Sequence, residues 1–368
     1  MELPEDVFAK MNWASFNPSE TSGQARKDMI DHGVSVIYGP PLPHVPVDAG
    51  GNRAGEVDWS EFDRTLARVP SYFTLLWGGP PPCKWPEGTA PKEDSPEHIA
   101  GFKTAIHELA SHLSAKGLGY RQWAFYPIDE PWNTGFTLIP QLKRFCQRVK
   151  ESDPKAQVYA DPAGLVRIEY LNEFKGLIDI WQPELNLLKR DPKLLEWFHA
   201  NARRLWAYEA PGPAKDLLPL GHYRAYAWFA VRFDLEGVGY WVYRGEDNWW
   251  TPLPGAVAST TDYSAVYQTN DLVVPSRRWE ADRDGVEDYR AVYLLRDEIK
   301  KSRAAGRIED ADRAEKLIDE AAGKIVGWQI GTIDEITRMT RDYEIEFELF
   351  QQYRERIAQE IEKLRAKE

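Results

Sequence analysis

The sequence predicts an α/β fold, a (β/α)8 TIM barrel with a C-terminal α-helical extension, and three observations support this. Short runs rich in β-branched and aromatic residues alternate with helical patterns along the first three quarters of the chain. Eight such strand–helix pairs can be counted, the number that closes a barrel of this type. All 26 prolines lie at or before Pro275, which leaves a nearly continuous helical pattern in the last quarter. We expect the barrel to span residues 1–300 and the extension residues 301–368.

The predicted strands are short apolar or aromatic runs bounded by turn residues, as expected for strands that are buried on both faces. In chain order they span 7–13, 34–38, 72–77, 122–126, 157–160, 179–182, 204–208 and 239–243. The helices predicted between them span 22–32, 59–69, 96–116, 139–152, 166–174, 192–201 and 223–235. A further helix near 285–300 follows the eighth strand. The charged stretch at 283–290 opens this helix, and we expect it to supply helix capping and ion pairs that close the barrel.

The extension is predicted to contain two more helices, at 309–325 and 333–367. The second begins with Thr332 and Glu335, which have the spacing of a capping box. Its apolar stripe must be covered by the preceding helix, by the barrel wall or by a second subunit, the last making a homo-oligomer through the C-terminal helices. The residues of the stripe are Ile336, Met339, Tyr343, Phe347, Phe350, Tyr353, Ile357, Ile361 and Leu364.

Composition excludes several classes of protein. The formal charge of −12 argues against a nucleic-acid partner, which calls for a basic face. Two distant cysteines, Cys83 and Cys146, exclude a disulfide framework and a cysteine-rich zinc module. His107 and His112 are five residues apart instead of four, so they do not form a zinc-protease motif, and we expect neither metal nor cofactor.

Two features of the chain bear on its location. No stretch approaches 18 apolar residues, so we expect no membrane span. The acidic start, Met-Glu-Leu-Pro-Glu-Asp, is not a signal peptide. Both features predict a cytoplasmic location for the chain as it stands, or a secreted or periplasmic one if the chain has been trimmed.

Candidate functional residues lie at the C-terminal ends of the predicted strands, where barrel enzymes build their active sites. Carboxylates and aromatic side chains concentrate there, in a chain with 15 Trp, 17 Tyr and 14 Phe. Aromatic rings stack on sugar faces, and carboxylates bind hydroxyls and carry protons, so this combination indicates a carbohydrate site. Asp129 and Glu130 follow strand four and are the main candidates for glycoside chemistry. The structural alternative is that Asp129 caps the next helix and Glu130 is a solvated first-turn residue.

Glu209, at the end of strand seven, leaves two mechanisms open. Glu130 could work as acid/base with Glu209 as nucleophile, as in ordinary retaining glycosidases. Alternatively, Glu130 works with Asp129, and the substrate supplies its own nucleophile. Glu209 would then bind a hydroxyl or fix a loop. The further substrate-binding candidates are Trp181, Tyr208, Glu209, Trp241, Tyr243, Trp249, Asp262 and Asp161. For each aromatic residue among them, core packing is the alternative.

Four segments together resemble the catalytic domain of glycoside hydrolase family 123, over about residues 7–300. They are Tyr-Pro-Ile-Asp-Glu-Pro-Trp at 126–132, Trp-Ala-Tyr at 206–208, Gly-Tyr-Trp at 239–241 and Arg-Asp-Gly-Val-Glu-Asp-Tyr at 283–289. Two features differ from the family, whose members commonly carry an N-terminal β-sandwich domain. Here the first barrel strand is predicted within about ten residues of Met1. The long C-terminal helices have no counterpart.

The resemblance implies an exo-acting β-N-acetylgalactosaminidase that acts on oligosaccharides or glycoconjugates with terminal β-linked N-acetylgalactosamine (GalNAc). It implies that Glu130 is the general acid/base and that Asp129 orients the 2-acetamido group and stabilises an oxazolinium, with retention of configuration and no cofactor. Such a reaction suits the physics, because an intramolecular nucleophile gains proximity and a nearby carboxylate stabilises developing positive charge. A retaining β-glycosidase that uses Glu130 and Glu209 is one alternative. A non-catalytic carbohydrate-binding barrel is the other.

Overall fold

The computed structural model describes residues 7–12, 23–133, 135–209, 220–243, 264–268, 273–327 and 347–367. Eight strands close into a parallel barrel in the spatial order β1-β10-β9-β8-β7-β6-β4-β2. They are β1 (Ala9–Asn12), β2 (Val36–Tyr38), β4 (Thr74–Trp77), β6 (Trp123–Phe125), β7 (Gln157–Ala160), β8 (Ile180–Trp181), β9 (Arg204–Glu209) and β10 (Gly237–Tyr240). Each overlaps a predicted strand, so the (β/α)8 prediction is confirmed.

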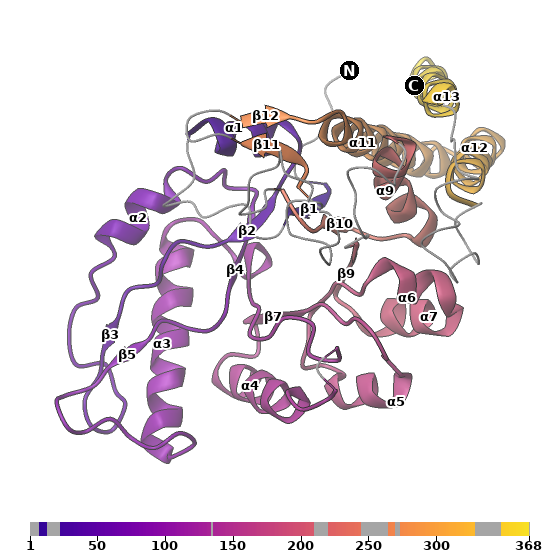
Figure 1. Ribbon diagram of the computed structural model, residues 1–368. Coiled ribbons are helices and arrows are strands. Elements are labelled where there is room, and N and C mark those ends of the chain that lie inside the picture. The colour runs from indigo at the N-terminus through magenta and orange to yellow at the C-terminus, as the bar shows by residue number, and fades with distance from the viewer. Residues whose placement is uncertain are drawn as a thin grey trace, which may run out of the picture.

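Helices surround the barrel, and most lie where the sequence predicts them (Figure 1). They are α1 (Gly23–Asp31), α2 (Ser60–Leu66), α3 (Pro96–Ala115), α4 (Ile139–Ser152), α5 (Ile168–Leu171), α6 (Leu185–Arg190), α7 (Pro192–Asn201), α9 (Leu220–Phe233) and α11 (Arg277–Ala304), with 3-10 turns η1 (Tyr120–Gln122) and η2 (Asn172–Phe174). Local signals fix several ends. At α3, the Ser95 hydroxyl accepts the amide of His98 at 3.2 Å, and Pro96 occupies the first helical position.

Some elements differ from the prediction. Helix α6 and two small sheets were not predicted; the sheets are β3 (Val45–Pro46) with β5 (Cys83–Lys84), and β11 (Val266–Gln268) with β12 (Val273–Pro275). Helix α11 begins at Arg277 because Ser276 caps it, its hydroxyl accepting the amide of Trp279 at 3.2 Å. The stretch 283–290 therefore lies inside α11 instead of opening it. The expected boundary at residue 300 also falls inside this helix.

Side chains on the barrel strands alternate between two hydrophobic layers. One alternate set, including Met11, Val36, Leu76, Tyr159 and Trp206, forms a cluster inside the barrel. The intervening residues belong to the larger cluster between the strands and the helices. Because the period is two, this alternation also decides which residues at the strand ends face the barrel mouth.

The charged stretch 283–290 joins α11 to the barrel wall. Asp288 accepts two hydrogen bonds from the Arg224 guanidinium on α9, at 2.8 and 2.9 Å, and one from the Trp228 indole at 3.1 Å. Gly285 lets the two helices approach, since a Cβ there would lie 2.4 Å from the Arg224 carbonyl oxygen. Closer to the start of α11, Asp282 accepts a hydrogen bond from Lys10 on β1. The stretch thus supplies an ion pair that joins α11 to α9, whereas the capping expected of it falls to Ser276 and the pair with β1 to Asp282.

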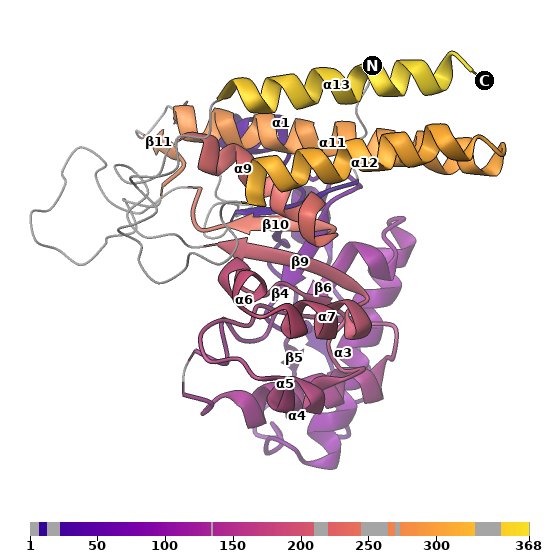
Figure 2. The same ribbon diagram turned by 90° about the vertical axis from the view of Figure 1, so that its right-hand side faces the viewer.

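Helices α12 (Ile308–Val326) and α13 (Phe347–Arg365) lie alongside α11 on one side of the barrel (Figure 2). The described part of the predicted stripe, which includes Phe350, Ile357 and Leu364, is buried within the chain. The remainder of the stripe up to Tyr343, with Thr332 and Glu335, lies outside the described residues; Phe347 opens α13, but its side chain is not described.

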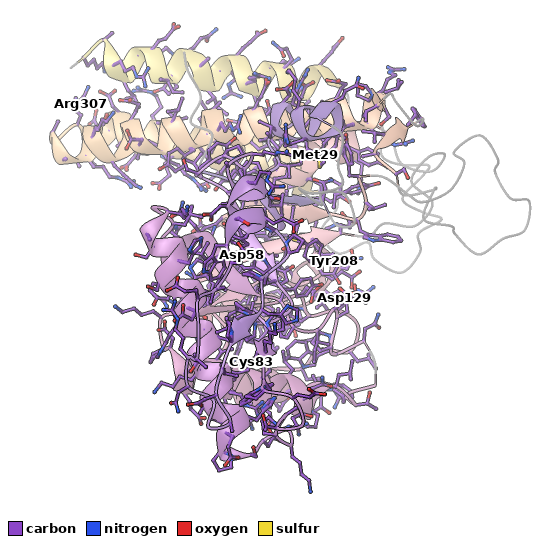
Figure 3. The ribbon with its side chains drawn as sticks, turned by 90° about the vertical axis from the view of Figure 1, so that its left-hand side faces the viewer. Met29, Asp58, Cys83, Asp129, Tyr208 and Arg307 are labelled. Atoms are coloured by element: carbon purple, nitrogen blue, oxygen red, sulfur yellow. The ribbon has the colours of Figure 1, made fainter. Side chains whose placement is uncertain are left out.

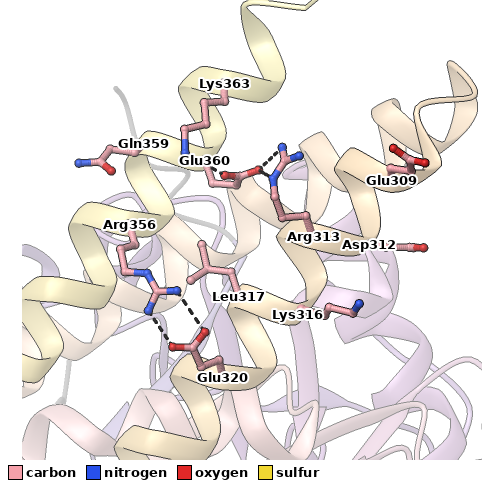
Figure 4. Close-up of a pocket in the computed structure, with 10 residues that line it drawn as sticks. All are labelled: Glu309, Asp312, Arg313, Lys316, Leu317, Glu320, Arg356, Gln359, Glu360 and Lys363. Atoms are coloured by element: carbon pink, nitrogen blue, oxygen red, sulfur yellow. Dashed lines mark hydrogen bonds and ion pairs between the residues drawn. The ribbon is translucent and has the colours of Figure 1, made fainter.

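A groove of about 660 Å³ runs between α12 and α13 (Figure 4). Two ion pairs cross it, Arg313 with Glu360 and Arg356 with Glu320. Within the described ranges, no helix is both long and apolar enough to cross a membrane.

Candidate functional site

The site is built at the barrel mouth, where the residues directly after β6 and β7 meet the last residues of β9. Tyr126 has the inward parity of Ala124, Asp161 that of Tyr159, and Tyr208 that of Trp206. Asp129 and Glu130 follow Tyr126 after Pro127 and Ile128. Asp129 and Tyr208 lie at the same end of the barrel in Figure 3. The structure thus brings together four predicted site residues, Asp129, Glu130, Asp161 and Tyr208.

The Tyr126 hydroxyl joins two carboxyl groups. It lies in hydrogen-bond contact with Asp129 Oδ1 and with Asp161 Oδ2. Asp161 is 1% exposed, whereas Asp129 is exposed at the mouth. Burial, and next the charge of Asp129, raise the pKa of Asp161 well above its usual range. The two aspartates therefore sit in opposite environments, one buried and one facing solvent.

Glu130 is fixed by three contacts and a strained backbone. Its Oε1 accepts the Tyr208 hydroxyl, its Oε2 accepts Asn133 Nδ2 at 2.9 Å, and its amide donates to Asp161 Oδ1 at 3.1 Å. The φ of +40° puts this residue in the left-handed region, which costs a non-glycine residue about 1–2 kcal/mol. Strained backbone of this kind clusters at functional sites, where the surroundings hold it in place. A solvated first-turn residue would need none of these contacts.

Glu209 does not face the mouth, which corrects its predicted role as a nucleophile or sugar ligand. It has the outward parity of Leu205 and Ala207, is 2% exposed and lies 3.9 Å from Lys189 Nζ and 3.6 Å from His222 Nε2. Those two residues belong to α6 and α9, so the carboxylate lies in the layer behind the barrel wall.

The electrostatics of Glu209 fit a buried ion pair. Burial raises its pKa, but Lys189, His222 and a hydrogen bond from Tyr226 outweigh burial, so the net shift is downward. Burial likewise lowers the pKa of His222 to about 4. The Glu209 carbonyl also accepts the amide of Trp241 at 3.2 Å. These contacts join β9 to α6 and α9, which is a structural role and not the expected binding of a hydroxyl.

Two of the predicted stacking residues, Trp181 and Tyr243, belong to the core. Among the aromatic candidates in the described ranges, Tyr208 is part of the inner cluster and Trp241 packs against it. Trp181 is 1% exposed, because its outward parity directs the ring toward Trp132, Trp197 and Phe198. The Tyr243 hydroxyl donates to Asp28 Oδ2 at 2.8 Å, and its ring packs on Trp279. The prediction that Trp181 and Tyr243 bind sugar is therefore corrected. Trp241 is half-buried and packs on the inner cluster.

The two other predicted ligands, Trp249 and Asp262, lie outside the described residues.

Several residues of the site were not predicted. Tyr38 at the end of β2 stacks on Tyr126, with ring centroids 6.2 Å apart, and Asn133 holds Glu130. Glu184, after β8, is partly buried, and burial is the largest of the effects that raise its pKa, ahead of the charges of Glu209 and Glu130. Strand-end position combined with the alternation of each strand would have selected Tyr38 and Tyr126.

Among the described residues, the barrel mouth contains the exposed carboxylate of Asp129, the Glu130 side chain held by hydrogen bonds, and aromatic rings. Such a set can move a proton, stabilise positive charge and stack on a sugar. No group of three or more His, Cys, Asp or Glu side chains in the described part of the chain is arranged to hold a metal ion. Fold and site therefore define a (β/α)8 barrel with an acidic and aromatic mouth.

Comparison with known proteins adds little to this description. No family model matches the chain, and no curated protein does. Solved structures with some similarity include a glycoside hydrolase family 5 mannosidase from Rhizomucor miehei, at 14% identity over 78% of this chain and 93% of that one, with a TM-score of 0.41. An endo-β-1,4-mannanase from Thermotoga petrophila has 12% identity over 77% and 76%, with a TM-score of 0.43.

A β-galactosidase from the psychrophilic Marinomonas ef1 has 11% identity over 87% of this chain and 65% of that one, with a TM-score of 0.45. Values this low carry no argument about activity.

Proposed function

We propose that this chain is a glycoside hydrolase that removes terminal β-linked GalNAc from oligosaccharides or glycoconjugates, with retention and with assistance from the substrate. One observation carries the proposal: Asp129 and Glu130 stand together at the barrel mouth, with Glu130 pinned in a strained backbone, while Glu209 is turned behind the wall. Glu209 therefore does not supply a nucleophile from the protein. The acetamido group of the substrate fills that role.

The steps of the proposed reaction use the two neighbours differently. Glu130 protonates the glycosidic oxygen as the 2-acetamido carbonyl oxygen attacks the anomeric carbon and the glycosidic bond breaks. Asp129 accepts a hydrogen bond from the acetamido N–H and stabilises the positive charge of the oxazolinium. Glu130, now ionised, takes a proton from the water that opens the ring. Two inversions at the anomeric carbon give net retention.

A conventional double displacement is less well supported. It needs two carboxyl groups about 5 Å apart on either side of the sugar. Glu209 would have to leave Lys189 and His222 and pass through the wall to reach the mouth. That movement would strand a buried lysine without its partner, which is costly.

A non-catalytic carbohydrate-binding barrel would use the same residues, so only a measurement of turnover distinguishes it from the proposed enzyme. Aryl β-GalNAc substrates test it on the wild type, on Glu130→Gln and on the surface control Glu173→Gln, whose carboxylate pairs with Lys143. We expect hydrolysis by wild type and control. Glu130→Gln should lose at least about 10²-fold on a nitrophenyl glycoside and less on a dinitrophenyl glycoside, since the latter leaving group needs no proton.

Inhibition completes the test. A thiazoline mimic of the oxazoline should inhibit competitively because the site is expected to bind the cyclised intermediate. Sugar binding in calorimetry without hydrolysis of any aryl glycoside would contradict the proposal and favour a binding protein. The remaining expectations (cytoplasmic or exported location, oligomerisation through the C-terminal helices, and the division near residue 300) stay proposals beside it.

A further inference from the structure

The protons shared by Tyr126, Asp129 and Asp161 can be counted. The Tyr126 hydroxyl contacts Asp129 Oδ1 and Asp161 Oδ2. A phenol has one proton to donate and accepts through its oxygen. It cannot donate fully to two ionised carboxylates at once. Protonation of one carboxyl group resolves this conflict, because that group then donates to the Tyr126 oxygen.

Burial decides which carboxyl group keeps the proton. Asp161 is 1% exposed, while Asp129 faces solvent at the mouth. A charge is far more costly in the buried position, so the neutral form belongs to Asp161. Its Oδ1 already accepts the amide of Glu130 at 3.1 Å, which leaves Oδ2 to carry the proton toward Tyr126.

The groups around Asp161 act on its charge in two directions. The charge of Asp129 disfavours a second carboxylate at Asp161, whereas the hydrogen bonds from the Tyr126 hydroxyl and the Glu130 amide favour the ionised form. Tyr38 from β2, Tyr159 from β7 and Tyr208 from β9 also face Asp161, and none of these groups is a cation that would offset the cost of burial. Burial and Asp129 outweigh the hydrogen bonds, so the pKa of Asp161 is raised.

We propose that Asp161 is a positioning residue held as a neutral carboxylic acid, and that a directed chain runs from Asp161 Oδ2–H to the Tyr126 oxygen and from the Tyr126 O–H to Asp129 Oδ1. This chain fixes the rotamer of Asp129 at the mouth. In the proposed reaction, Asp129 is then ready to accept the acetamido N–H. That last role rests on the proposed function, whereas the proton count does not.

The protonation state is tested by stability, without any substrate. Asp161→Asn reproduces the neutral acid, because its Nδ2 donates to Tyr126 and its Oδ1 accepts the Glu130 amide. The wild type takes up a proton at Asp161 on folding whenever the unfolded carboxyl is ionised, so its stability falls as pH rises above about 4. Asparagine removes that dependence.

In urea unfolding of the full chain between pH 4.5 and 7.5, the stability of Asp161→Asn relative to the wild type should therefore increase as pH rises. The ratio of the two unfolding constants should change by about tenfold per pH unit. Asp153→Asn is the matched control, since Asp153 accepts the Tyr120 hydroxyl and the Lys155 amide at 2.9 Å. It should show no such gain. A wild-type minus Asp161→Asn difference that is flat or reversed with pH would overturn the neutral acid.

Turnover provides the second measurement. On aryl β-GalNAc, Asp161→Asn should keep kcat/KM within about tenfold of the wild type, while Asp161→Ala, which breaks the chain, should lose at least about 10²-fold. If Asp161→Asn is as inactive as Asp129→Asn, the positioning role is wrong. If the wild type itself does not hydrolyse β-GalNAc, the proposed function fails, and the pH dependence of stability still decides the protonation of Asp161.

Discussion

Replacing Gly285 by alanine tests the closure of the barrel by α11. A Cβ at this position would lie 2.4 Å from the Arg224 carbonyl oxygen and 3.2 Å from its Cα. These are backbone atoms of α9, so the two helices must move apart by about 1 Å to restore van der Waals contact. The same movement stretches the two hydrogen bonds between Arg224 and Asp288.

Overpacking of this kind costs about 1–3 kcal/mol, and weakening a buried charged pair adds to it. We expect Gly285→Ala to lower the free energy of unfolding by about 3 kcal/mol. At about 2 °C per kcal/mol for a chain of this size, the fall in Tm is about 6 °C. Thermal unfolding followed by circular dichroism measures it directly.

Gly323 in α12 is the matched control, since a Cβ there meets nothing within 4 Å. Alanine has a higher helix propensity than glycine, so Gly323→Ala should raise the free energy of unfolding by up to about 1 kcal/mol. The two substitutions are chemically identical and should move Tm in opposite directions. A Gly285→Ala protein as stable as Gly323→Ala would refute the close packing of α9 on α11.

Two further predictions concern the site and the wall behind it. Tyr208→Phe removes the hydroxyl that Glu130 Oε1 accepts and should lower kcat/KM on aryl β-GalNAc by about 10–100-fold with little change in Tm; unchanged kinetics would exclude Tyr208 from positioning Glu130. Glu209→Gln removes the carboxylate that contributes most to stabilising the buried Lys189 charge and should lower the free energy of unfolding by about 3 kcal/mol near pH 7, as measured by urea unfolding. Because the pKa of Glu209 is lowered in the folded protein, its contribution is present above the unfolded pKa of about 4.3 and is lost as pH falls through the folded value, so the gap to wild type should narrow in acid. An inactive Glu209→Gln of wild-type stability would restore Glu209 as a nucleophile.

The barrel was predictable from sequence because its signals are local. The bounds 139–152 and 192–201 match α4 and α7, where a proline stands within the first two helical positions of each helix. Helix α11 starts earlier than predicted because Ser276 caps it directly after Pro275. That cap outweighed the weaker pattern that placed the start near Gly285.

The site was predictable only in part, because the positions of the strand ends were predicted but the direction in which each side chain points was not. Asp129, Glu130, Asp161 and Tyr208 were selected by their position at strand ends, and the structure places them together. Trp181 and Glu209 are also at strand ends, but the two-residue period turns both away from the mouth. The left-handed backbone at Glu130 has no sequence signal, because a non-glycine residue there is held by tertiary contacts.

The participation of the acetamido group is tested most directly by two substrates that differ in one substituent. We would measure kcat/KM for nitrophenyl β-GalNAc and for nitrophenyl β-galactoside, which carries a hydroxyl in place of the acetamido group. An intramolecular nucleophile predicts a preference for β-GalNAc of at least about 10³-fold, and Asp129→Asn should remove most of it. Comparable rates on the two substrates, unchanged by Asp129→Asn, would contradict the proposed mechanism.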